Sequence, residues 1–443
     1  MYNILYCFNY SNIILDLYNI AHYKSMSAHN YGKYLHINRQ KKQGLGVKSE
    51  RTYHVVTHNP STASAGETLN IRIPRLAQNY VIVPNTLKLT FHIVLSGADH
   101  NKYIVNNLGR NIITRKVSKI GGTIIRDLNN CYLYDTFCDL WKTTKERRNM
   151  SFQGIQSLNL RQLRSKASNA DTNNSEDNAI NQVYGNKYMI PLDFEIYTDH
   201  LPFYPFAIPE DFTEDLTFAS NENIIISKDT NDWSYKISNI CLEYETFYDE
   251  SLARQINDRY IDGISFLYDH VTHFKTEEIR DATLINININ VPKRSLKGAL
   301  LLFEEKFTDG ARDSEKFSNP SISHLDITIE GLVNKIFSQG YKALYQWSEC
   351  RKHFAPSEEH KHNDNLDIDE LEFYGSDKFA LWVDLRSTED VNLHGSGLRL
   401  ENTKDGIQLA ITRNAKENYK MHIFLVADAQ INIVGNSLRD VLY

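Results

Sequence analysis

Cysteine is scarce in this chain and follows no pairing pattern. The 443 residues include five cysteines (Cys7, Cys131, Cys138, Cys241 and Cys350), with no CxxC pair and no metal-site spacing. An odd number of unpatterned cysteines is typical of reduced thiols in an intracellular setting and excludes a disulfide framework as the basis of the fold.

The sequence also lacks the motifs of the common enzyme classes. It contains no P-loop, no GxGxxG, no HExxH and no GxSxG nucleophile elbow. A GxG does occur in "LHGSGLR" (393–399), where we predict a turn between strands. We therefore expect no enzymatic activity, no catalytic residues and no cofactor.

Two histidine-containing stretches are weak candidates for chemistry. The stretch "HFAPSEEHKHND" holds His353, His360 and His362, but a highly charged loop offers no fixed scaffold, so we interpret them as solvated and predict no metal site. In "TDH" (198–200) an Asp stands beside a His, yet a dipeptide defines no geometry in space.

Long hydrophobic runs are absent as well. In residues 1–25 ("MYNILYCFNYSNIILDLYNIAHYKS") the apolar residues are interrupted by Asn, Tyr and Asp16, which argues against a membrane-spanning helix. The segment has no basic start and no small-residue cleavage site, so we predict no signal peptide. Because Met26 begins a more polar stretch, we expect residues 1–25 to be a translated leader, with Met1 as the alternative start.

The charge distribution is slightly acidic overall but locally basic. A net charge of -6 argues against a protein whose whole surface binds nucleic acid. Residues 33–51, however, contain six Lys or Arg and one acid, Glu50. We interpret residues 1–50 as a flexible leader and basic arm; an arm that touches nucleic acid or a neighbouring subunit is the alternative.

Strand-forming residues are abundant, with 26 Tyr and 20 Phe. Apolar and polar residues alternate repeatedly from Thr52 onward, as in "LKLTFHIVL" (87–95) and "LINININV" (284–291). We interpret the Asn row of the second stretch as a solvated or hydrogen-bonding face. The unbroken apolar run "GALLLFEE" (298–305) predicts a strand covered on both sides. Further strands are predicted at 69–73, 112–120, 187–198, 223–227, 235–249, 324–331, 379–387, 406–412 and 419–433.

Three segments have helical spacing instead. Leu133, Phe137, Leu140 and Trp141 recur at the spacing of one helix face, which predicts a helix at about 129–150. Residues 250–261 predict a connecting helix, and about 340–352 predict another. The polar stretch 160–187 is expected to be an exposed excursion. The pattern as a whole predicts an all-β protein with two β-sandwich domains, 51–249 and 250–443.

Three motifs resemble those of the major capsid proteins of large double-stranded DNA viruses. In that family a strand runs through a glycine pair into a helix inside the first jelly roll. The stretch "IPLDFEIYTDHLPFYPFAI" (190–208), with Pro191 and Leu192, is similar to the family's apolar–Pro–Leu strand and return strand. "ICLEYETFYDESLARQI" (240–256) resembles the strand, acidic turn and helix that end the first jelly roll. The positions that match the first motif are Gly121, Gly122, Ile125, Asp127, Leu140 and Trp141.

Two further stretches, "NNLGRNIITRKVSKIGG" and "GSGLRLENTKDGIQL", look like those of the polinton (Maverick) and adintovirus group. The resemblance spans about residues 50–440, whereas 160–187 and the extreme N-terminus match nothing. It implies two consecutive eight-stranded jelly rolls with short helical insertions. It also implies a homotrimer that acts as a pseudo-hexameric capsomer of an icosahedral virion.

The same resemblance implies the partners and the cellular setting. The chain would be made in the host cytoplasm or nucleus and would contact itself and minor capsid or penton proteins, with no small-molecule substrate. The basic arm 33–51 would contact the genome or inner components. The helix at 129–150 would either cover a flank or edge of a sandwich or plug its own domain.

Three other functions fit part of the pattern. A tandem β-sandwich protein that binds glycans on Tyr and Trp platforms would be expected to be secreted, and neither a signal peptide nor a disulfide pattern is present. A β-sandwich hydrolase would need two carboxylates that flank a cleft. A minor vertex capsid protein would usually need a single jelly roll, and this chain has enough strands for two.

Overall fold

The computed structural model describes most of the chain from Arg51 onward, and the leader and basic arm expected in residues 1–50 lie outside it. Antiparallel sheets dominate, which confirms the predicted all-β class. The described residues are 51–96, 102–167, 186–198, 202–227, 233–305, 314–333, 345–355, 366–375, 377–388, 393–401, 406–414 and 416–443.

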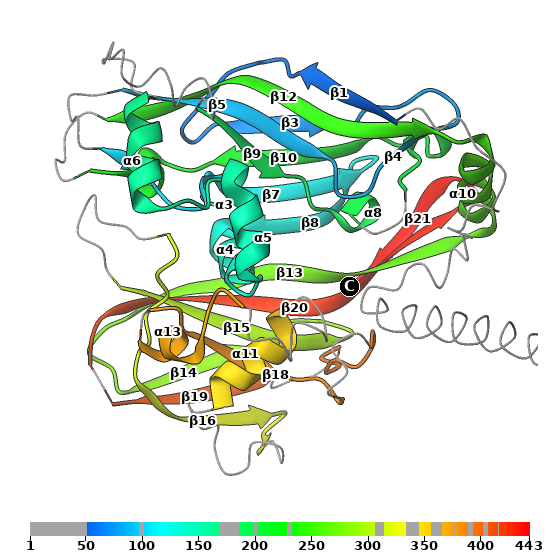
Figure 1. Cartoon of the computed structure of the whole chain (residues 1–443). Coiled ribbons are helices and arrows are strands. Elements are labelled where there is room, and N and C mark those ends of the chain that lie inside the picture. Colours follow the sequence, from blue (N-terminus) through cyan, green and yellow to red (C-terminus); the bar gives the residue numbers. More distant parts are fainter. Residues whose placement is uncertain are drawn as a thin grey trace, which may run out of the picture.

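Residues before Asp249 form a first sandwich of two sheets, seen as the upper layers in Figure 1. One sheet has the order β1 (Arg51–Thr57), β12 (Ser234–Tyr248), β5 (Lys88–Ser96) and β9 (Lys187–Pro191), with β2 (Ala63–Ser64) and β4 (Tyr80–Ile82) also paired to β12. The other sheet has the order β3 (Thr68–Arg72), β10 (Phe212–Phe218), β7 (Ile113–Ile120) and β8 (Thr123–Asn129). A small third sheet pairs β6 (Tyr103–Ile104) with β11 (Ile225–Ile226).

Residues after Gly263 form the second sandwich, below the first in Figure 1. Its larger sheet has the order β13 (Ile264–Ile279), β20 (Tyr419–Val434), β15 (Leu296–Glu305) and β18 (Ala380–Asp384), and β21 (Ser437–Leu442) also pairs with β20. Its other sheet has the order β14 (Leu284–Ile289), β19 (Ile407–Arg413), β16 (Ile322–Ile329) and β17 (Leu332–Val333).

In these strands the apolar residues of the alternating sequence pattern are buried and the polar residues between them are more exposed. Leu89, Phe91, Ile93 and Leu95 of β5 are fully buried, because successive side chains of a strand point to opposite faces. In β14 the isoleucines are buried while the asparagines are exposed, as predicted. All of β15 except Glu305 is buried, which agrees with a strand covered on both sides.

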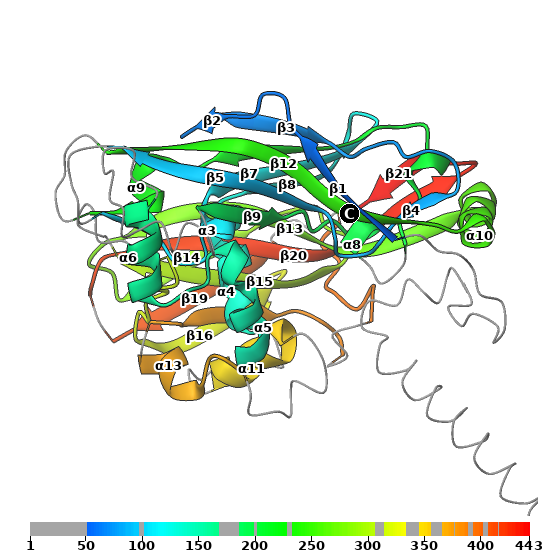
Figure 2. The same ribbon diagram turned by 45° about the horizontal axis from the view of Figure 1, so that its top comes forward.

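The longest strand pair, β13 with β20, was only half predicted, because β13 lacks a clean period-2 pattern. The two strands are paired from Ile264↔Ile433 to Ile279↔Tyr419. In Figures 1 and 2 this pair extends beyond the second sandwich towards the first. The ring of Phe266 lies 6.3 Å from that of Tyr260 in the helix α10.

Short helices connect the strands. The expected connecting helix coincides with α10 (Glu250–Asp262), which Asp249 caps through the backbone N–H of Leu252. The helix expected near 340–352 is described as α11 (Gln346–Phe354), and residues 334–344 lie outside the described part. The others are α3 (Leu108–Asn111), α4 (Cys131–Leu140), α5 (Thr144–Asn149), η2 (Met150–Gln153), α6 (Leu158–Ala167), α8 (Glu195–Thr198), η4 (Pro205–Ala207), α9 (Asn221–Ile224) and α13 (Glu370–Gly375).

Three segments differ from the predictions. The single helix expected at 129–150 is divided into α4 and α5, because Thr143 and Glu146 form a capping box that begins a new helix. The run 187–198 forms β9 and then α8: Pro191 has no backbone N–H to continue the ladder. The run 223–227 begins with the last two residues of the four-residue helix α9, before the short β11.

The polar excursion expected at 160–187 begins with regular structure. Its first residues belong to α6, where the Arg164 guanidinium lies 3.8 Å from the ring centre of Tyr188. The attraction between the guanidinium and the aromatic ring compensates for the burial of the Arg164 charge. This contact holds the polar helix α6 in place, although α6 has no apolar stripe. Residues 168–185 of the excursion lie outside the described part. In the described part of the chain, no helix is both long and apolar enough to span a bilayer.

Candidate functional site: the junction between the sandwiches

The helix α4 lies between the two sandwiches (Figures 1 and 2). It follows β8 directly, and Asn130 turns the chain into the helix with a left-handed backbone (φ 50°), a conformation that Asn tolerates better than most residues. Its face with helical spacing is fully buried, including Leu133, Phe137 and the following Trp141. The helix therefore places a continuous apolar surface at the junction.

The aromatic side chains of α4 pack against aromatic side chains of the second sandwich. The Trp141 ring centre lies 5.0 Å from that of Trp347 in α11, and Phe137 lies 5.1 Å from Phe354. Aromatic pairs at such distances contribute about 0.5–1.5 kcal/mol each beyond the area they bury. We call these residues the aromatic cluster: Tyr134, Phe137, Trp141, Phe317, Trp347, Phe354, Phe373 and Phe424.

Polar contacts surround the aromatic cluster. Arg147 of α5 is buried and donates to Glu315 at 2.9 Å, and its Nε lies 2.5 Å from a carboxylate oxygen of Asp367. The backbone N–H of Asp367 donates to the carbonyl of Lys142 at 3.1 Å. These bonds join the segment 142–147 to the second half of the chain.

A second line of contact joins β8 to β13. The Tyr268 hydroxyl donates to the carbonyl of Ile125 at 2.8 Å, and the Tyr268 ring lies 6.3 Å from that of Phe194.

The aromatic contacts also show the role of α4. This helix, which interrupts the first sandwich, covers a sheet face of the other sandwich. It does not merely plug its own domain, because its buried aromatic face meets α11 and β20.

A largely buried network of charges, with Asp193 at its partly exposed edge, fixes α4 within the first sandwich. Arg110 of α3 lies 2.6 Å from Asp193 and 3.2 Å from Asp139, and Lys116 of β7 lies 2.8 Å from Asp135 and 3.2 Å from Asp193. Asn107 and Gln153 also donate to Asp139, at 2.9 and 2.8 Å. Because buried charges are costly unless they are paired and hydrogen-bonded, these residues hold one another in a single arrangement.

The network shifts the pKa values of Lys116, Asp139 and Asp193 in the directions that keep these three groups charged. Burial alone would raise the pKa of Asp139, but Arg110 and Lys142 outweigh it and lower that pKa. The pKa of Asp193 is also lowered by Arg110 and Lys116, again against the effect of burial. Burial would lower the pKa of Lys116, yet Asp135 and Asp193 raise it.

Sequence reasoning missed this network, although a signal was present. The strand pattern of 112–120 places Lys116 on the same face as Ile120, which is fully buried. Asp135 and Asp139 are four residues apart, so they lie on one face of α4. A cation on an apolar strand face next to a pair of acids on the following helix is the pattern that would have indicated it.

The predicted motif positions are spread along the path from β7 to the junction. Gly121 and Gly122 form the hairpin turn between β7 and β8, with φ of 55° and 87°, the backbone that a two-residue hairpin of type I′ requires. Ile125 is fully buried and accepts the bond from Tyr268. Leu140 and Trp141 end α4 at the junction.

The remaining motif positions have different surroundings. Asp127 lies on the outer face of its sheet, in an ion pair with Arg115 at 2.7 Å. Pro191 ends β9, and Leu192 is buried beside it. Asp193, the next residue, is the network member that connects this motif to Arg110 and Lys116. Two motifs far apart in sequence thus meet through one set of ion pairs.

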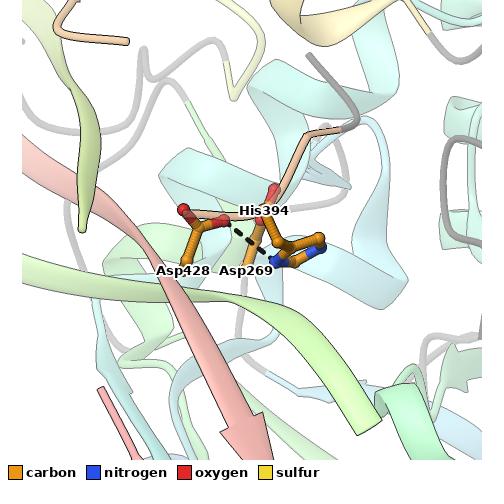
Figure 3. Close-up of side chains that lie close together, drawn as sticks. All are labelled: Asp269, His394 and Asp428. Carbon is orange, nitrogen blue, oxygen red and sulfur yellow. Dashed lines mark ion pairs between the residues drawn. The ribbon is translucent and has the colours of Figure 1, made fainter. Parts of the chain in front are cut away.

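One cluster has the donor atoms of a metal site. Asp269, His394 and Asp428 place one potential ligand atom each within 4.8 Å of one another, and among the described residues no other such group is found. Figure 3 shows the three side chains converging, with His394 paired to Asp428. The cluster is built by β13, β20 and the "LHGSGLR" loop.

A side-chain cation already pairs with both carboxylates of this cluster. The Lys297 ammonium lies 2.5 Å from Asp269 and 3.1 Å from Asp428. Ser295 and the backbone N–H of Gly395 donate to Asp428, at 2.5 and 2.9 Å. The carboxylates are therefore paired within the protein, and the arrangement clamps the 393–401 loop onto β20. The GxG of this loop includes the turn residue Gly395 (φ 79°), as predicted.

The other histidines considered as candidates for chemistry in the sequence are placed differently by the structure. His353, which we expected in a solvated loop, instead lies near the end of α11 and stacks on Trp382 at 4.0 Å. The apolar partners of that helix, and not the local charge pattern, determine its position. His360, His362 and residues 199–200 of "TDH" lie outside the described residues.

The aromatic cluster predicts a large effect of replacing Trp141. We expect W141A to lower the free energy of unfolding by about 3–5 kcal/mol, the range for truncating a large buried aromatic side chain. Urea denaturation measures this value. W141F should cost much less, because the indole N–H has no hydrogen-bond partner among the described residues and the ring packing is largely kept. F152A, at a residue 55% exposed, is the control; equal losses in W141A and F152A would refute the role of the cluster.

The charge network makes a separate prediction. D139N should cost about 3–5 kcal/mol, because it removes a buried carboxylate that pairs with Arg110 and accepts hydrogen bonds from Asn107 and Gln153. D127N removes a solvent-exposed partner and should cost less than about 1 kcal/mol. A lowered Asp139 pKa contributes stability at neutral pH that is lost as the pH falls through the acid range. The same denaturation series below pH 5 should therefore show a shallower pH dependence in D139N than in the wild type.

Comparison with known proteins gives similarity in structure only. No protein-family model matches the chain, and no curated protein matches its sequence. A chain of the PBCV-1 virus capsid superposes with a TM-score of 0.56 at 11% identity, covering 91% of this chain and 99% of that one. The Faustovirus major capsid protein gives 0.53 at 9% identity (90% and 92% covered), and a chain of the Sputnik virophage gives 0.52 at 12% identity (90% of each).

These matches extend over both sandwiches and the junction. The identities are far below the level at which function can be transferred, so the likeness concerns architecture. The chain therefore has the double jelly-roll fold that the major capsid proteins of these viruses share.

Proposed function

We propose that this chain is a structural major capsid protein, without enzymatic activity, that builds an icosahedral shell. The observation that carries the proposal is the match of the whole double jelly roll, which covers 91% of this chain and 99% of the PBCV-1 capsid chain. A fold by itself does not define function, but here the match extends over nearly the whole of both chains.

The junction supports this function physically. A shell subunit must present its two sandwiches in a fixed relation, because identical interfaces in a repeating assembly require subunits of one shape. The aromatic cluster and the Arg147 contacts join the sandwiches through side chains that are mostly buried. This rigidity is what a repeating lattice requires.

The assembly that follows is a homotrimer. Three copies of two sandwiches give six similar units around one axis, which is a pseudo-hexameric capsomer. Closed rotational symmetry satisfies identical interfaces with identical chains. We propose self-association into trimers and then into the lattice of a virion, with minor capsid or penton proteins as further partners.

Several finer assignments belong to this proposal. The jelly-roll domains are residues 51–249 and 250–443, and the basic arm 33–51 contacts the genome or inner components. The motif residues from Gly121 to Leu192 act as structural positions of the first jelly roll. The polinton (Maverick) and adintovirus group is the proposed lineage, and the host cytoplasm or nucleus is the proposed place of synthesis.

The glycan-binding alternative has less support. Of the four tryptophans of the chain, Trp141 and Trp382 are fully buried, and Trp347 is packed against the core. They are therefore not available as exposed platforms for sugars. A single-jelly-roll vertex protein is also disfavoured, because two sandwiches are present.

The solution mass of the purified full chain tests the proposal. Light scattering behind a sizing column should give three times the chain mass of 51.3 kDa, about 154 kDa, and electron microscopy should show hexagonal capsomers or shells. A monomer at all concentrations that shows no shells would contradict the proposal. If that monomer bound immobilised glycans, the lectin-like alternative would replace it.

A further inference from the structure

Three histidines lie where the sandwiches meet, and each is held in an environment that suits only a neutral imidazole. His270 and His273 belong to β13, and His353 belongs to α11. The proposed capsid function does not use them, and of the three only His353 was a candidate in the sequence.

His273 is part of a hydrogen-bonded chain that crosses the junction. Its Nε2 lies 3.1 Å from the Thr276 hydroxyl, which lies 3.0 Å from Nδ1 of His422. Nε2 of His422 lies 2.9 Å from a carboxylate oxygen of Glu304. On the other side, the Asn130 amide at the start of α4 lies 3.4 Å from Nε2 of His273. The chain therefore runs from α4 into the larger sheet of the second sandwich.

The partners determine the direction of these hydrogen bonds. A carboxylate only accepts, so His422 donates to Glu304 through Nε2–H. The Asn130 amide N–H only donates, so Nε2 of His273 accepts from it and carries no proton. A proton on this Nε2 would break that bond, and the adjacent Thr276 hydroxyl has a single proton to share between the two rings. Protonation of both rings would place two positive charges on rings whose centres are 5.8 Å apart.

His270 lies beside cations. Its Nδ1 is 3.1 Å from the Lys293 ammonium, and its ring stacks on Tyr443 at 4.8 Å. Since an ammonium can only donate, this Nδ1 must be the unprotonated acceptor. Arg126 of β8, in the first sandwich, adds further positive charge. A proton on Nδ1 of His270 would break the bond to Lys293 and add repulsion.

His353 lies against the aromatic cluster itself. Its ring stacks on Trp382 at 4.0 Å and meets Phe354 edge-on at 4.7 Å. Its Nδ1 is buried and has no hydrogen-bond partner among the described residues. A second ring N–H would therefore have no acceptor here, and such an unsatisfied donor is costly.

We propose that the junction is an acid-sensitive element, in which protonation of His270, His273 and His353 weakens the contact of α4 with the second sandwich. At neutral pH the two sandwiches form one rigid unit. In acid the junction loosens, and the sandwiches can change their relative orientation while each keeps its own sheets.

The surrounding charges support this behaviour, and their signs differ from site to site. His273 faces His422 and Lys420, with Glu304 beyond His422. His270 faces Lys293 and Arg126, and Asp127 acts in the opposite direction. The charged groups around His353 are of both signs, namely Asp269, Asp384, Lys297 and Arg386. Burial is the largest effect at all three rings.

The pKa shifts agree with the geometry. Burial, then His422 and Lys420, lower the pKa of His273 to about 4. Burial and Lys293 lower the pKa of His270 to about 3, and burial lowers that of His353 to about 3. A folded-state pKa below the unfolded value means that stability is fully present above about pH 6.5 and is lost as the pH falls from there towards the folded value.

The experiment compares the full chain with single variants across pH. By linkage, each neutral histidine should reduce the folding equilibrium constant about 20-fold between pH 7 and pH 5, measured by urea denaturation. H273Q keeps a hydrogen-bonding side chain but cannot titrate. The fall in its folding equilibrium constant between pH 7 and pH 5 should therefore be about 20-fold smaller than in the wild type. H270Q and H353Q provide independent tests if H273Q folds poorly. H324Q, at a partly exposed histidine paired with Asp326, is the matched control and should keep the wild-type pH dependence.

Hydrogen exchange locates the effect. At pH 5, after correction for intrinsic rates, the amides of α4 should lose protection while those of β5 and β15 keep it. Uniform protection at both pH values, or a pH dependence unchanged in all three variants, would overturn the proposal. The result is independent of shell formation, because a monomeric chain with this junction would respond in the same way.

Discussion

The packing of α4 between the two sandwiches is the contact on which the rest of the structure depends. Without Phe137 and Trp141, the junction would keep mainly the polar bonds of Arg147 and the Tyr268 contact. Such bonds give direction but little net free energy in contact with water. The aromatic cluster excludes water from the junction, so the surrounding ion pairs act in a less polar environment. The two sandwiches thereby become one unit.

The charged groups of Arg110, Lys116, Asp139 and Asp193 cost free energy, because they are withdrawn from water on folding. In many proteins such ion pairs can be replaced by apolar side chains without loss of stability. Here they join α3, β7, α4 and the segment after β9, and they are satisfied in one relative placement. We regard them as the groups that fix the direction in which α4 leaves the first sandwich, whereas the aromatic cluster supplies the free energy at its far side. The acid-sensitive histidines lie at that same far side.

Much of the fold could be predicted from the sequence, because the alternation of apolar and polar residues shows which face of a strand is buried inside its own sandwich. β5, β14 and β15 follow the expected patterns closely. β13 was missed because its two halves contact different partners: Tyr268 meets the first sandwich, and His273 faces β20 and α4. The charge network was missed because pairing between Asp193 and Arg110 depends on a fold that brings distant motifs together. The resemblance identified the helix ending at Trp141, but the contact with Trp347 required the structure.

The central claim is that the two sandwiches open as one cooperative unit at neutral pH. Native-state hydrogen exchange, followed by mass spectrometry over a series of low denaturant concentrations, measures this most directly. Peptides from β5 (Lys88–Ser96) and β15 (Leu296–Glu305) represent the two cores. The account predicts that both converge on the same free energy of opening and the same denaturant dependence. If one core exchanged through a separate, lower-energy opening while the other stayed protected, the junction would not unite the sandwiches and the account would be wrong.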